Sequence, residues 1–498
     1  MSALLQEGTS ASKRGEALER LNAYIEELRQ RKKPIGSLEE FEREAHELVV
    51  QVEQEVVAEG LSRFDIDALV VEVDGQRYRQ VYRGERAYLS AAGEVRVARS
   101  LYRAKGGKTI CPLEMQAGIV DGYWTPLAAR QGVWVTAQLP PAEGEALFRE
   151  LGNMAPSKSS LDRLSRELGQ GWEAHREGFE ASLCEAITVP PGAVSVSASL
   201  DGVMVPMKRP PGQGSSDTRA KGERQGKDPA EAAAGKSDGV KAQDADEEDS
   251  PKKPFYKEAS CATLSFYDAA GERLDTLRFA RMPEPGKKTL KSQLSAAVAA
   301  VLGQRPELQL VKLADGAKDN WRFLADELRP GEGVELIDFF HASDHLSNAL
   351  QVAHGKGSTK AKAQHKKYRT ILRDEQGGVE TVIRALDYLK KKHPRREKLA
   401  TELSYFRNNR HRMQYAAARA NHLPIGSGVT EAACKTLVTQ RLKCSGMRWK
   451  TKGGQGVLTM RGLIQSGRFD SGWQLLSRTY RQAVSMPDNV VPLNARSR

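Results

Sequence analysis

The chain has 498 residues, more than one hydrophobic core usually organises, so we expect roughly two to four domains. Its formal net charge of +12 and isoelectric point of about 9.3 predict an acidic partner. For a chain of this size that partner is most often nucleic acid, and a basic protein without such a partner is the plain alternative.

The cysteines and the hydropathy of the sequence indicate where in the cell the protein is expected. The five cysteines form no CxxC pair, which gives no support to a zinc ribbon or a dithiol redox motif and suits a reducing environment. No apolar run approaches the roughly 18 residues that span a bilayer, and the N-terminus lacks the apolar centre of a signal peptide. We therefore expect a cytoplasmic protein with no membrane partner.

Residues 1–60 are predicted to form a helical segment whose first fifteen residues fray. Apolar residues recur at helical spacing on both sides of Pro34 and Gly36, which divide the pattern into two helices. The apolar positions are Leu18, Leu21, Ile25 and Leu28, followed by Phe41, Ala45, Leu48 and Val52.

Residues 61–140 are predicted to be a small antiparallel β module. From about residue 66 to 135 the sequence is rich in β-branched and aromatic residues punctuated by glycines. Its arginines predict an exposed basic face. They are Arg77, Arg79, Arg83, Arg86, Arg96, Arg99 and Arg103.

Residues 141–190 return to a helical pattern. Two short amphipathic helices joined by a tight turn make a candidate helix-turn-helix, with Lys158, Arg163 and Arg166 facing outward. An ordinary helical hairpin explains the same pattern equally well. With the β module, this segment would complete an α+β N-terminal DNA-binding region.

Residues 191–355 together with 421–450 predict one mixed α/β unit. A strand runs through Asp201, and a hairpin surrounds the DAAGE stretch. Further on we expect a helix, a strand, a helix, a strand and two more helices. Their expected ranges are 288–302, 308–314, 318–328, 334–340 and Val429 to about Ser445, the last preceded by a helix that opens with HASDHLSNAL.

Three segments lie outside this predicted sheet unit. Residues 209–257 have almost no apolar bulk and predict a disordered insertion between the first and second strands. Residues 356–420 are basic and predict a helical insertion. Residues 451–498 are expected to be a C-terminal tail.

Three separated acidic residues form the candidate catalytic and metal-binding site. Asp201 lies within a strand, Asp315 ends one, and Glu431 lies in the first turn of a helix. Ligands of open α/β sheets bind beyond the carboxyl ends of strands, and a glycine after each aspartate leaves room for a metal and a phosphate. Three carboxylates of this kind suit a pair of Mg²⁺ or Mn²⁺ ions rather than zinc. Each has a structural alternative: a turn or helix cap for the aspartates, and a favourable helix-dipole position for Glu431.

Basic and aromatic residues follow Glu431 on the same predicted helix and beyond it. Lys435 and Lys443 continue its face at helical spacing, so we expect them to contact a phosphate backbone. Trp449 would stack on a base, or else lie in a core at a domain edge. The predicted DNA-contacting residues are Arg163, Arg166, Lys435, Arg441, Lys443, Arg448 and Trp449.

Two histidines, His341 and His345, lie four residues apart on one predicted helix. The residue after His341 is Ala342, so the pair is not the HExxH motif of zinc proteases. One or both of them would hydrogen-bond the acidic site or a phosphate, or else they have only a packing role in the fold.

Four blocks, SASLDGVMVPMK, KLADGAKDNW, DFFHASDHL and LPIGSGVTEAACKTLVTQRLKCSGMRWK, closely resemble, in this order, the blocks of Kra-type bacterial insertion-sequence transposases. The stretches GEVRVARSLYRAKGG and CPLEMQAGIVDGYWTP are similar to the N-terminal region of that family, so the resemblance covers most of the chain. The blocks at 195–208, 311–321 and 423–449 are the most specific.

The resemblance implies a DDE transposase with a ribonuclease H-like catalytic core, whose triad falls on Asp201, Asp315 and Glu431. It implies metal-dependent cleavage of transposon ends and strand transfer into target DNA, with two Mg²⁺ ions as cofactors. Double-stranded DNA would be the partner, as terminal inverted repeats and as target, bound by a homo-oligomer at the nucleoid. A nuclease of the same fold without strand transfer, and a non-catalytic DNA-binding regulator, are the alternatives.

Overall fold

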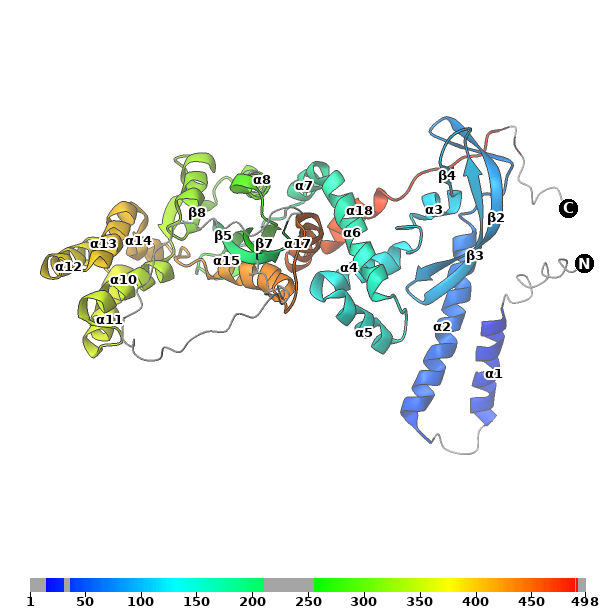
Figure 1. Cartoon of the computed structure of the whole chain (residues 1–498), viewed down its shortest axis with the longest axis horizontal. Coiled ribbons are helices and arrows are strands. Elements are labelled where there is room, and N and C mark those ends of the chain that lie inside the picture. The colour runs from blue at the N-terminus through cyan, green and yellow to red at the C-terminus, as the bar shows by residue number, and fades with distance from the viewer. Residues whose placement is uncertain (1–14, 31–35, 210–254, 489, 491–498) are drawn as a thin grey trace, which may run out of the picture.

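The computed structural model describes residues 15–30, 36–209, 255–488 and 490. The described residues form an elongated molecule, with a helical hairpin and a β module at one end, a mixed sheet in the middle and a helical bundle at the other end (Figure 1). Within the described ranges, no helix combines the length and the apolar composition that a membrane crossing requires.

Two helices, α1 (Glu16–Gln30) and α2 (Leu38–Ser62), form a hairpin that projects beside the β module (Figure 1). The prediction of two helices, one on each side of Pro34 and Gly36, is confirmed, while Pro34 itself lies outside the described residues. Ser37 begins α2, since its side chain accepts a hydrogen bond from the backbone of Glu40. The two helices contain 12 glutamates against three arginines, so this arm carries a net charge of −9.

The β module is a four-stranded antiparallel sheet in the order β1-β2-β3-β4. The turn between its first two strands places Asp74 and Gly75 at positive φ, the conformation that a tight two-residue hairpin requires. The strands are β1 (Val70–Val73), β2 (Gln76–Ser90), β3 (Gly93–Arg103) and β4 (Thr109–Ile110).

The predicted extent of this module is too long. From Pro112 the chain is helical, in α3 (Pro112–Ala117) and α4 (Pro126–Gln138). Each helix has proline at its first position, where the missing N–H costs no hydrogen bond. The β-branched residues of α4, among them Val133 and Val135, are buried against neighbouring helices, so tertiary packing outweighs their strand preference.

The middle of the chain forms three helices, α5 (Pro141–Leu151), α6 (Lys158–Ala174) and α7 (Arg176–Glu185). One face of α6 is buried against α4 and α17 (Thr451–Gln465). Its outward face carries Arg163 and Arg166, as predicted, so α6 is a fixed part of the fold that presents two arginines to solvent.

The second sheet has five strands in the order β7-β6-β5-β8-β9. β5 pairs antiparallel with β6 and parallel with β8, β6 pairs antiparallel with β7, and β8 pairs parallel with β9. Because β5 and β6 are its first two strands, the predicted insertion does lie between them. Its predicted disorder at 210–254 lies outside the described residues, and the prediction is wrong for residues 255–257, which belong to β6. The strands are β5 (Ser195–Met207), β6 (Phe255–Tyr267), β7 (Arg273–Arg281), β8 (Gln309–Ala314) and β9 (Val334–Ile337).

Helices pack on this sheet and follow its strands along the chain. α8 (Lys288–Gln304) buries an apolar face against it, and α9 (Lys318–Trp321) continues into a π-helical turn at Arg322–Glu327. The predicted strand at 334–340 ends early, because Asp338 accepts a hydrogen bond from the backbone of His341 and begins α10 (Phe339–His354). The chain is thus a mixed α/β protein, as predicted.

The predicted helical insertion is confirmed as helices at the far end of the molecule (Figure 1). They pack on α10 and on one another. Their bounds are α11 (Thr359–Asp374), α12 (Gly378–Lys392), α13 (Glu397–Asn409), the 3₁₀ turn Arg410–Arg412 and α14 (Tyr415–Ala420).

The helix predicted from Val429 is interrupted. It consists of α15 (Gly428–Ala433), a π-helical turn at Cys434–Thr439 and α16 (Gln440–Leu442). The extra residue in a π turn shifts the faces that follow it, so a stripe expected from regular α-helical spacing does not continue unchanged.

The prediction of a C-terminal tail at 451–498 is wrong. Two helices, α17 and α18 (Phe469–Arg478), lie in the centre of the molecule, and most of α17 is buried against α6, α4 and β7. Gly169 and Gly456 allow α6 and α17 to approach so closely that a Cβ on Gly169 would lie 2.8 Å from Cα of Gly456. The chain then returns to the β module, where Ser485 pairs with Glu72.

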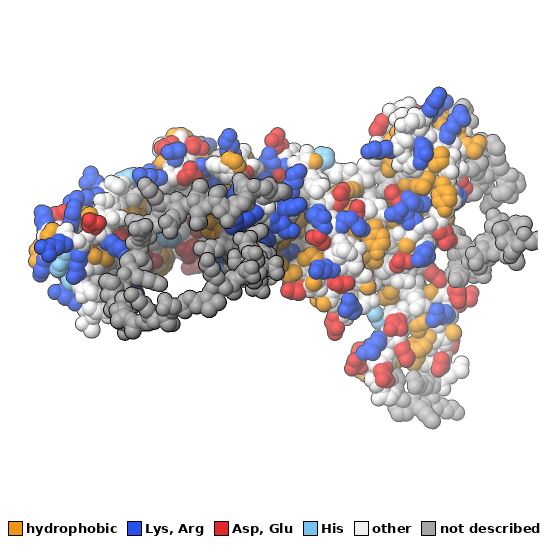
Figure 2. Space-filling view, viewed as in Figure 1, with side chains coloured by type: hydrophobic (Ala, Val, Ile, Leu, Met, Phe, Trp, Pro, Cys, Tyr) orange, Lys and Arg blue, Asp and Glu red, His pale blue; other side chains and the backbone are white. Residues whose placement is uncertain are grey.

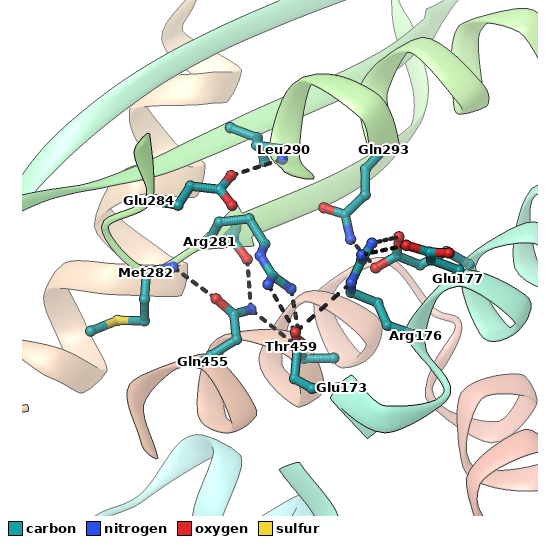
Figure 3. A network of polar contacts seen from close by, with 12 residues as sticks. Glu173, Arg176, Glu177, Arg281, Met282, Glu284, Leu290, Gln293, Gln455 and Thr459 are labelled. Carbon is teal, nitrogen blue, oxygen red and sulfur yellow. Dashed lines mark hydrogen bonds and ion pairs between the residues drawn. The ribbon is translucent and has the colours of Figure 1, made fainter. Parts of the chain in front are cut away.

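A polar network ties the helices α6 and α7 to the second sheet (Figure 3). Arg281 on β7 donates two hydrogen bonds, of 2.8 and 2.9 Å, to the carboxylate of Glu173 on α6. Gln455 on α17 accepts from the backbone of Met282, and Gln293 on α8 donates to Glu180 on α7. The network joins five elements that come from three separate parts of the sequence.

Candidate active site

Asp201 and Asp315 lie side by side where the parallel strands β5 and β8 separate. The last paired residues of these strands are Ser199 and Leu313, and two further residues along each chain lead to the two aspartates. On the far side β5 is joined to β6, so the strand connections diverge from this point in opposite directions. Such a switch point at the carboxyl ends of strands opens a crevice for a ligand.

The carboxylate of Asp201 is half-buried, and each of its oxygens has a contact within the protein. Its Oδ1 accepts a 2.7 Å hydrogen bond from the backbone N–H of Gly202, and its Oδ2 lies 3.9 Å from the Cys434 thiol, a weak donor. Burial raises the pKa of Asp201, the nearby charge of Asp315 adds to that effect, and the charges of His341 and Lys287 oppose it. Asp201 therefore lies within electrostatic reach of one further acid and two cations.

Asp315 lies in the candidate site and also makes the local hydrogen bond of a turn aspartate, the structural alternative predicted for it. Its Oδ1 accepts hydrogen bonds from the backbone of Ala317 at 3.1 Å and from the side-chain amide of Asn320 at 3.2 Å. These two contacts hold the carboxylate in position. Both are made by Oδ1, so a turn aspartate at this place could also bind a metal ion.

A cation that the sequence did not single out supports this pair. Lys287 donates to Oδ1 of Asn320 at 3.2 Å and forms a 2.9 Å ion pair with Glu258, so a chain of contacts runs from Glu258 to Asp315. Its backbone has φ 54°, in the left-handed region that residues other than glycine rarely adopt. Backbone strain of this kind is concentrated at functional sites.

The glycines after the two aspartates do not leave open space. A Cβ on Gly202 would lie 1.9 Å from Oε1 of Glu258, and a Cβ on Gly316 would lie 2.5 Å from the ring of Tyr405. The expectation of room for a metal and a phosphate at these two points is therefore corrected. The glycines let other side chains pack over the backbone of the site.

Glu431 is brought to the same place by α15. The neighbouring Thr430 hydrogen-bonds Thr263 on β6 at 2.7 Å, and Ala433 and Cys434 are buried against the sheet. The Glu431 side chain is 53% exposed, and its Oε1 lies 3.9 Å from Nδ1 of His341. Glu431 thus faces solvent at the edge of the site while the residues around it anchor the helix.

His341 lies among the three predicted acids. Its Nδ1 lies 3.5 Å from Oδ1 of Asp338, and among the described residues this nitrogen has no partner within hydrogen-bonding geometry. Its interaction with Asp338, reinforced by the charges of Asp315 and Glu431, raises the pKa of His341 to about 9. The imidazolium at neutral pH is a cation held between carboxylates, which agrees with a role behind the site.

Asp338 is a functional candidate that the sequence analysis passed over. Its side chain is 1% exposed and accepts hydrogen bonds from the backbone of His341 at 2.8 Å and from the hydroxyl and backbone N–H of Ser427. Burial alone would raise the pKa of Asp338, but the interaction with the His341 side chain and these hydrogen bonds outweigh it and lower the pKa to about 2. The sequence signal was an acid directly after a strand with a histidine three residues later.

His345 points away from the acids and toward the helical insertion. Its Nδ1 lies 2.6 Å from a carboxylate oxygen of Glu402, and its ring stacks on Tyr405 at a centroid distance of 3.7 Å. Tyr405 covers Gly316, and its hydroxyl is buried with no hydrogen-bond partner among the described residues. The insertion therefore reaches the edge of the site through Tyr405, which no sequence pattern indicated.

Among the described residues, no group of three or more His, Cys, Asp and Glu side chains is arranged to hold an ion. The acids nevertheless match in kind, because Asp201, Asp315 and Glu431 offer oxygen donors, the ligands that Mg²⁺ and Mn²⁺ prefer.

The predicted DNA-contacting residues separate into exposed and buried ones. Lys435, Lys443 and Arg448 are exposed, and Lys435 lies four residues after Glu431. Arg163 and Arg166 are also exposed, and they form ion pairs with Asp121 and Asp162.

Two of the predicted contacts have structural surroundings instead. Arg441 is 2% exposed, donates two hydrogen bonds to the carbonyl of Thr136 on α4, and has a pKa that burial lowers to about 10. The prediction that Arg441 contacts DNA is wrong for this conformation. Trp449 packs beneath Arg441, donates a hydrogen bond to the carbonyl of Leu442 and pairs with Met207. These surroundings agree with the alternative prediction of a core tryptophan at a domain edge.

Comparison with known proteins adds no relative: no family model matches the chain, and the curated proteins contain no significant match.

Proposed function

We propose that this chain is the DNA transposase of a bacterial insertion sequence, which cleaves transposon ends and joins them to target DNA. The observation that carries the proposal is the meeting of Asp201, Asp315 and Glu431 around His341. These acids lie on a strand, directly after a strand and on a helix, each more than a hundred residues from the next along the chain, and they are the triad that the resemblance implies.

The topology supports a ribonuclease H-like core. Three antiparallel strands in sequence are followed by two parallel strands on the other side of the first, and the first acid lies on the central strand β5. The helices α11 to α14 enter between β9 and α15, which is where the resemblance implies a helical insertion.

The chemistry would be in-line phosphoryl transfer. Two Mg²⁺ or Mn²⁺ ions held by Asp201, Asp315 and Glu431 would supply Lewis-acid activation of the attacking and leaving oxygens. The residues of the chain would position the acids: Lys287 and His341 offset the repulsion among them, and Asn320 holds Asp315. Lys435 and Lys443 would hold the phosphate backbone beside Glu431.

Double-stranded DNA is the proposed partner, as terminal inverted repeats and as target. The exposed arginines of the β module and of α6 would contribute phosphate contacts, with α6 as the recognition element if the α5–α6 pair acts as a helix-turn-helix. Two DNA ends must be held together, so a homo-oligomer on DNA at the nucleoid is part of the proposal.

Mg²⁺-dependent cleavage of a labelled transposon-end duplex tests the proposal. Asp201→Asn and Glu431→Gln should abolish cleavage while leaving DNA binding intact. Asp344→Asn is the matched control, since this exposed acid lies on α10 close to the site and its change alters the charge equally. Equal cleavage by all variants would refute the triad, and end binding without any cleavage would favour a non-catalytic regulator.

A strand-transfer assay separates the second candidate, a nuclease of the same fold. The assay measures joining of a pre-cleaved end to a target plasmid. Joining supports the transposase, and cleavage without joining supports the nuclease.

A further inference from the structure

The helical insertion carries the whole net charge of the protein. Residues 356–420 contain 18 lysines and arginines against six aspartates and glutamates, a net charge of +12, equal to that of the full chain. The remaining 433 residues are therefore neutral overall. A charge concentrated in this way in one unit indicates a surface for a polyanion rather than a general solubility feature.

In the insertion and beside it, basic side chains from α10, α11 and the junction of α12 and α13 lie close together at the end farthest from the β module. His354 ends α10, Lys360 lies in the first turn of α11, and Lys392, His393 and Arg396 form the junction of α12 and α13. We call these five residues the cationic cluster. Two hydrogen bonds join its parts: Arg396 donates to the carbonyl of Val352, and His354 contacts the side chain of Gln364 at 2.7 Å.

The charges of the cluster act on one another. Partial burial lowers the pKa of His393, and the charges of Arg396, Lys392, His354 and Lys360 lower it further. Of the described residues, no carboxylate lies within ion-pair distance of Lys360, Lys392 or Arg396, and these three side chains are exposed. Figure 2 shows Lys and Arg side chains gathered over this end of the molecule.

We propose that the cationic cluster is a second DNA-binding surface, which holds the phosphate backbone of duplex DNA independently of its sequence. This inference rests on the proposed function for the identity of the polyanion. Exposed, unpaired lysines at this end suit backbone contacts, and the cluster contains no Phe, Tyr or Trp side chain that would stack on unpaired bases. The site and the cluster both belong to α10, since His341 lies in its first turn and His354 ends it. DNA on the cluster would therefore be held at a fixed offset from the acids.

One acidic protein surface competes as an explanation. The hairpin of α1 and α2 has a net charge of −9, so the hairpin of a second copy could also bind the cluster. The observations favour DNA, because the excess of +12 exceeds what that hairpin neutralises and the cluster adjoins the helix that carries the site.

Binding of the full chain to a labelled duplex, measured by fluorescence anisotropy at several salt concentrations, tests the proposal. The double variant Lys360→Gln, Lys392→Gln should bind roughly tenfold more weakly at low salt, with the slope of log affinity against log salt reduced by about 2. The loss should be the same for a transposon-end duplex and a scrambled one. The matched control is Arg29→Gln, Arg43→Gln, which removes the same charge from exposed positions on the acidic hairpin.

The outcomes are distinct. If the variant and the wild type have equal salt slopes, the cluster is not a DNA surface, although the proposed function stands. If the wild type does not bind duplex DNA at all, the proposed function fails and this inference with it. If the variant keeps its DNA affinity but loses self-association in sedimentation, the acidic hairpin is the occupant and the DNA proposal is overturned.

Discussion

Asp338 and Ser427 are joined by two hydrogen bonds, from the backbone N–H and from the hydroxyl of Ser427 to one carboxylate oxygen. The contact spans 89 residues and closes the helical insertion at its base, because Asp338 follows β9 and Ser427 precedes α15. The same carboxylate holds the first turn of α10. One buried acid therefore places both Glu431 and His341 relative to the sheet.

Asp338→Asn should destabilise this junction. An amide replaces a buried carboxylate that accepts three hydrogen bonds, and charged acceptors contribute more than neutral ones, so we expect a loss of about 3 kcal/mol. Ser427→Ala removes only the hydroxyl and should cost about 1 kcal/mol. Thermal unfolding, with amide hydrogen exchange of α15, measures both effects. Equal protection of α15 in wild type and Asp338→Asn would contradict the positioning role.

The same residue gives a pH dependence with a definite sign. The pKa of Asp338 is lowered from 3.8 to about 2 in the folded protein, so its contribution to stability is present above pH 3.8 and is lost as the pH falls toward 2. The difference in thermal midpoint between wild type and Asp338→Asn should therefore shrink on acidification through this window. A difference that grows as the pH falls would show that the assignment is wrong.

The sequence predicted the parts of the fold that depend on local pattern. The strand through Asp201, the helical hairpin divided at Pro34 and Gly36, and the helical insertion all carry clear periodicity or turn residues. The tail prediction for 451–498 failed because α17 has glycine and polar residues on surfaces that are buried only after α6 and β7 pack on it. Its helical character depends on partners hundreds of residues away.

The candidate site shows the same limit. Acids next to strand ends were visible in the sequence, but Lys287, which contacts Asn320, and Tyr405, which covers Gly316, come from distant elements and have no local signal. Arg441 was misassigned because an arginine beside lysines has the same sequence pattern whether it faces solvent or donates to a carbonyl of α4. Burial of a charged residue is decided by tertiary contacts.

Lys287 should support catalysis without contacting DNA. Lys287→Met removes the partner of Asn320, whose amide holds Asp315, and removes a charge that offsets the acids. We expect metal-dependent cleavage to fall about tenfold, which corresponds to roughly 1.4 kcal/mol, at unchanged DNA affinity. Lys287→Arg should restore part of the rate. The adjacent, exposed Lys288→Met is the control, and an equal loss in both methionine variants would remove the special role of Lys287.

Arg441 and Lys443 should separate stability from DNA binding although they are two residues apart. Arg441→Met leaves the carbonyl of Thr136 without its two hydrogen bonds, so we expect a stability loss of about 1–3 kcal/mol and an unchanged salt slope of binding. Lys443→Gln should keep its stability and reduce that slope by about 1. Unfolding curves and anisotropy titrations on both variants decide the matter. A lower slope for folded Arg441→Met would mean that this side chain reaches DNA after all.

The pair of Glu173 and Arg281 should couple the N-terminal half to the sheet (Figure 3). Arg281 is almost fully buried and both its terminal nitrogens bond the carboxylate, so each partner depends on the other for compensation of its charge. In a double-mutant cycle with Glu173→Gln and Arg281→Met, the coupling should be about 1.5–3 kcal/mol, and the double variant should be more stable than the sum of single losses implies. Glu177→Gln, a change at an exposed neighbour on α7, should show no coupling to Arg281→Met. Additive single losses would instead mean that α6 is held to the sheet only through its packing on α17, which in turn contacts β7, and that the polar network adds nothing.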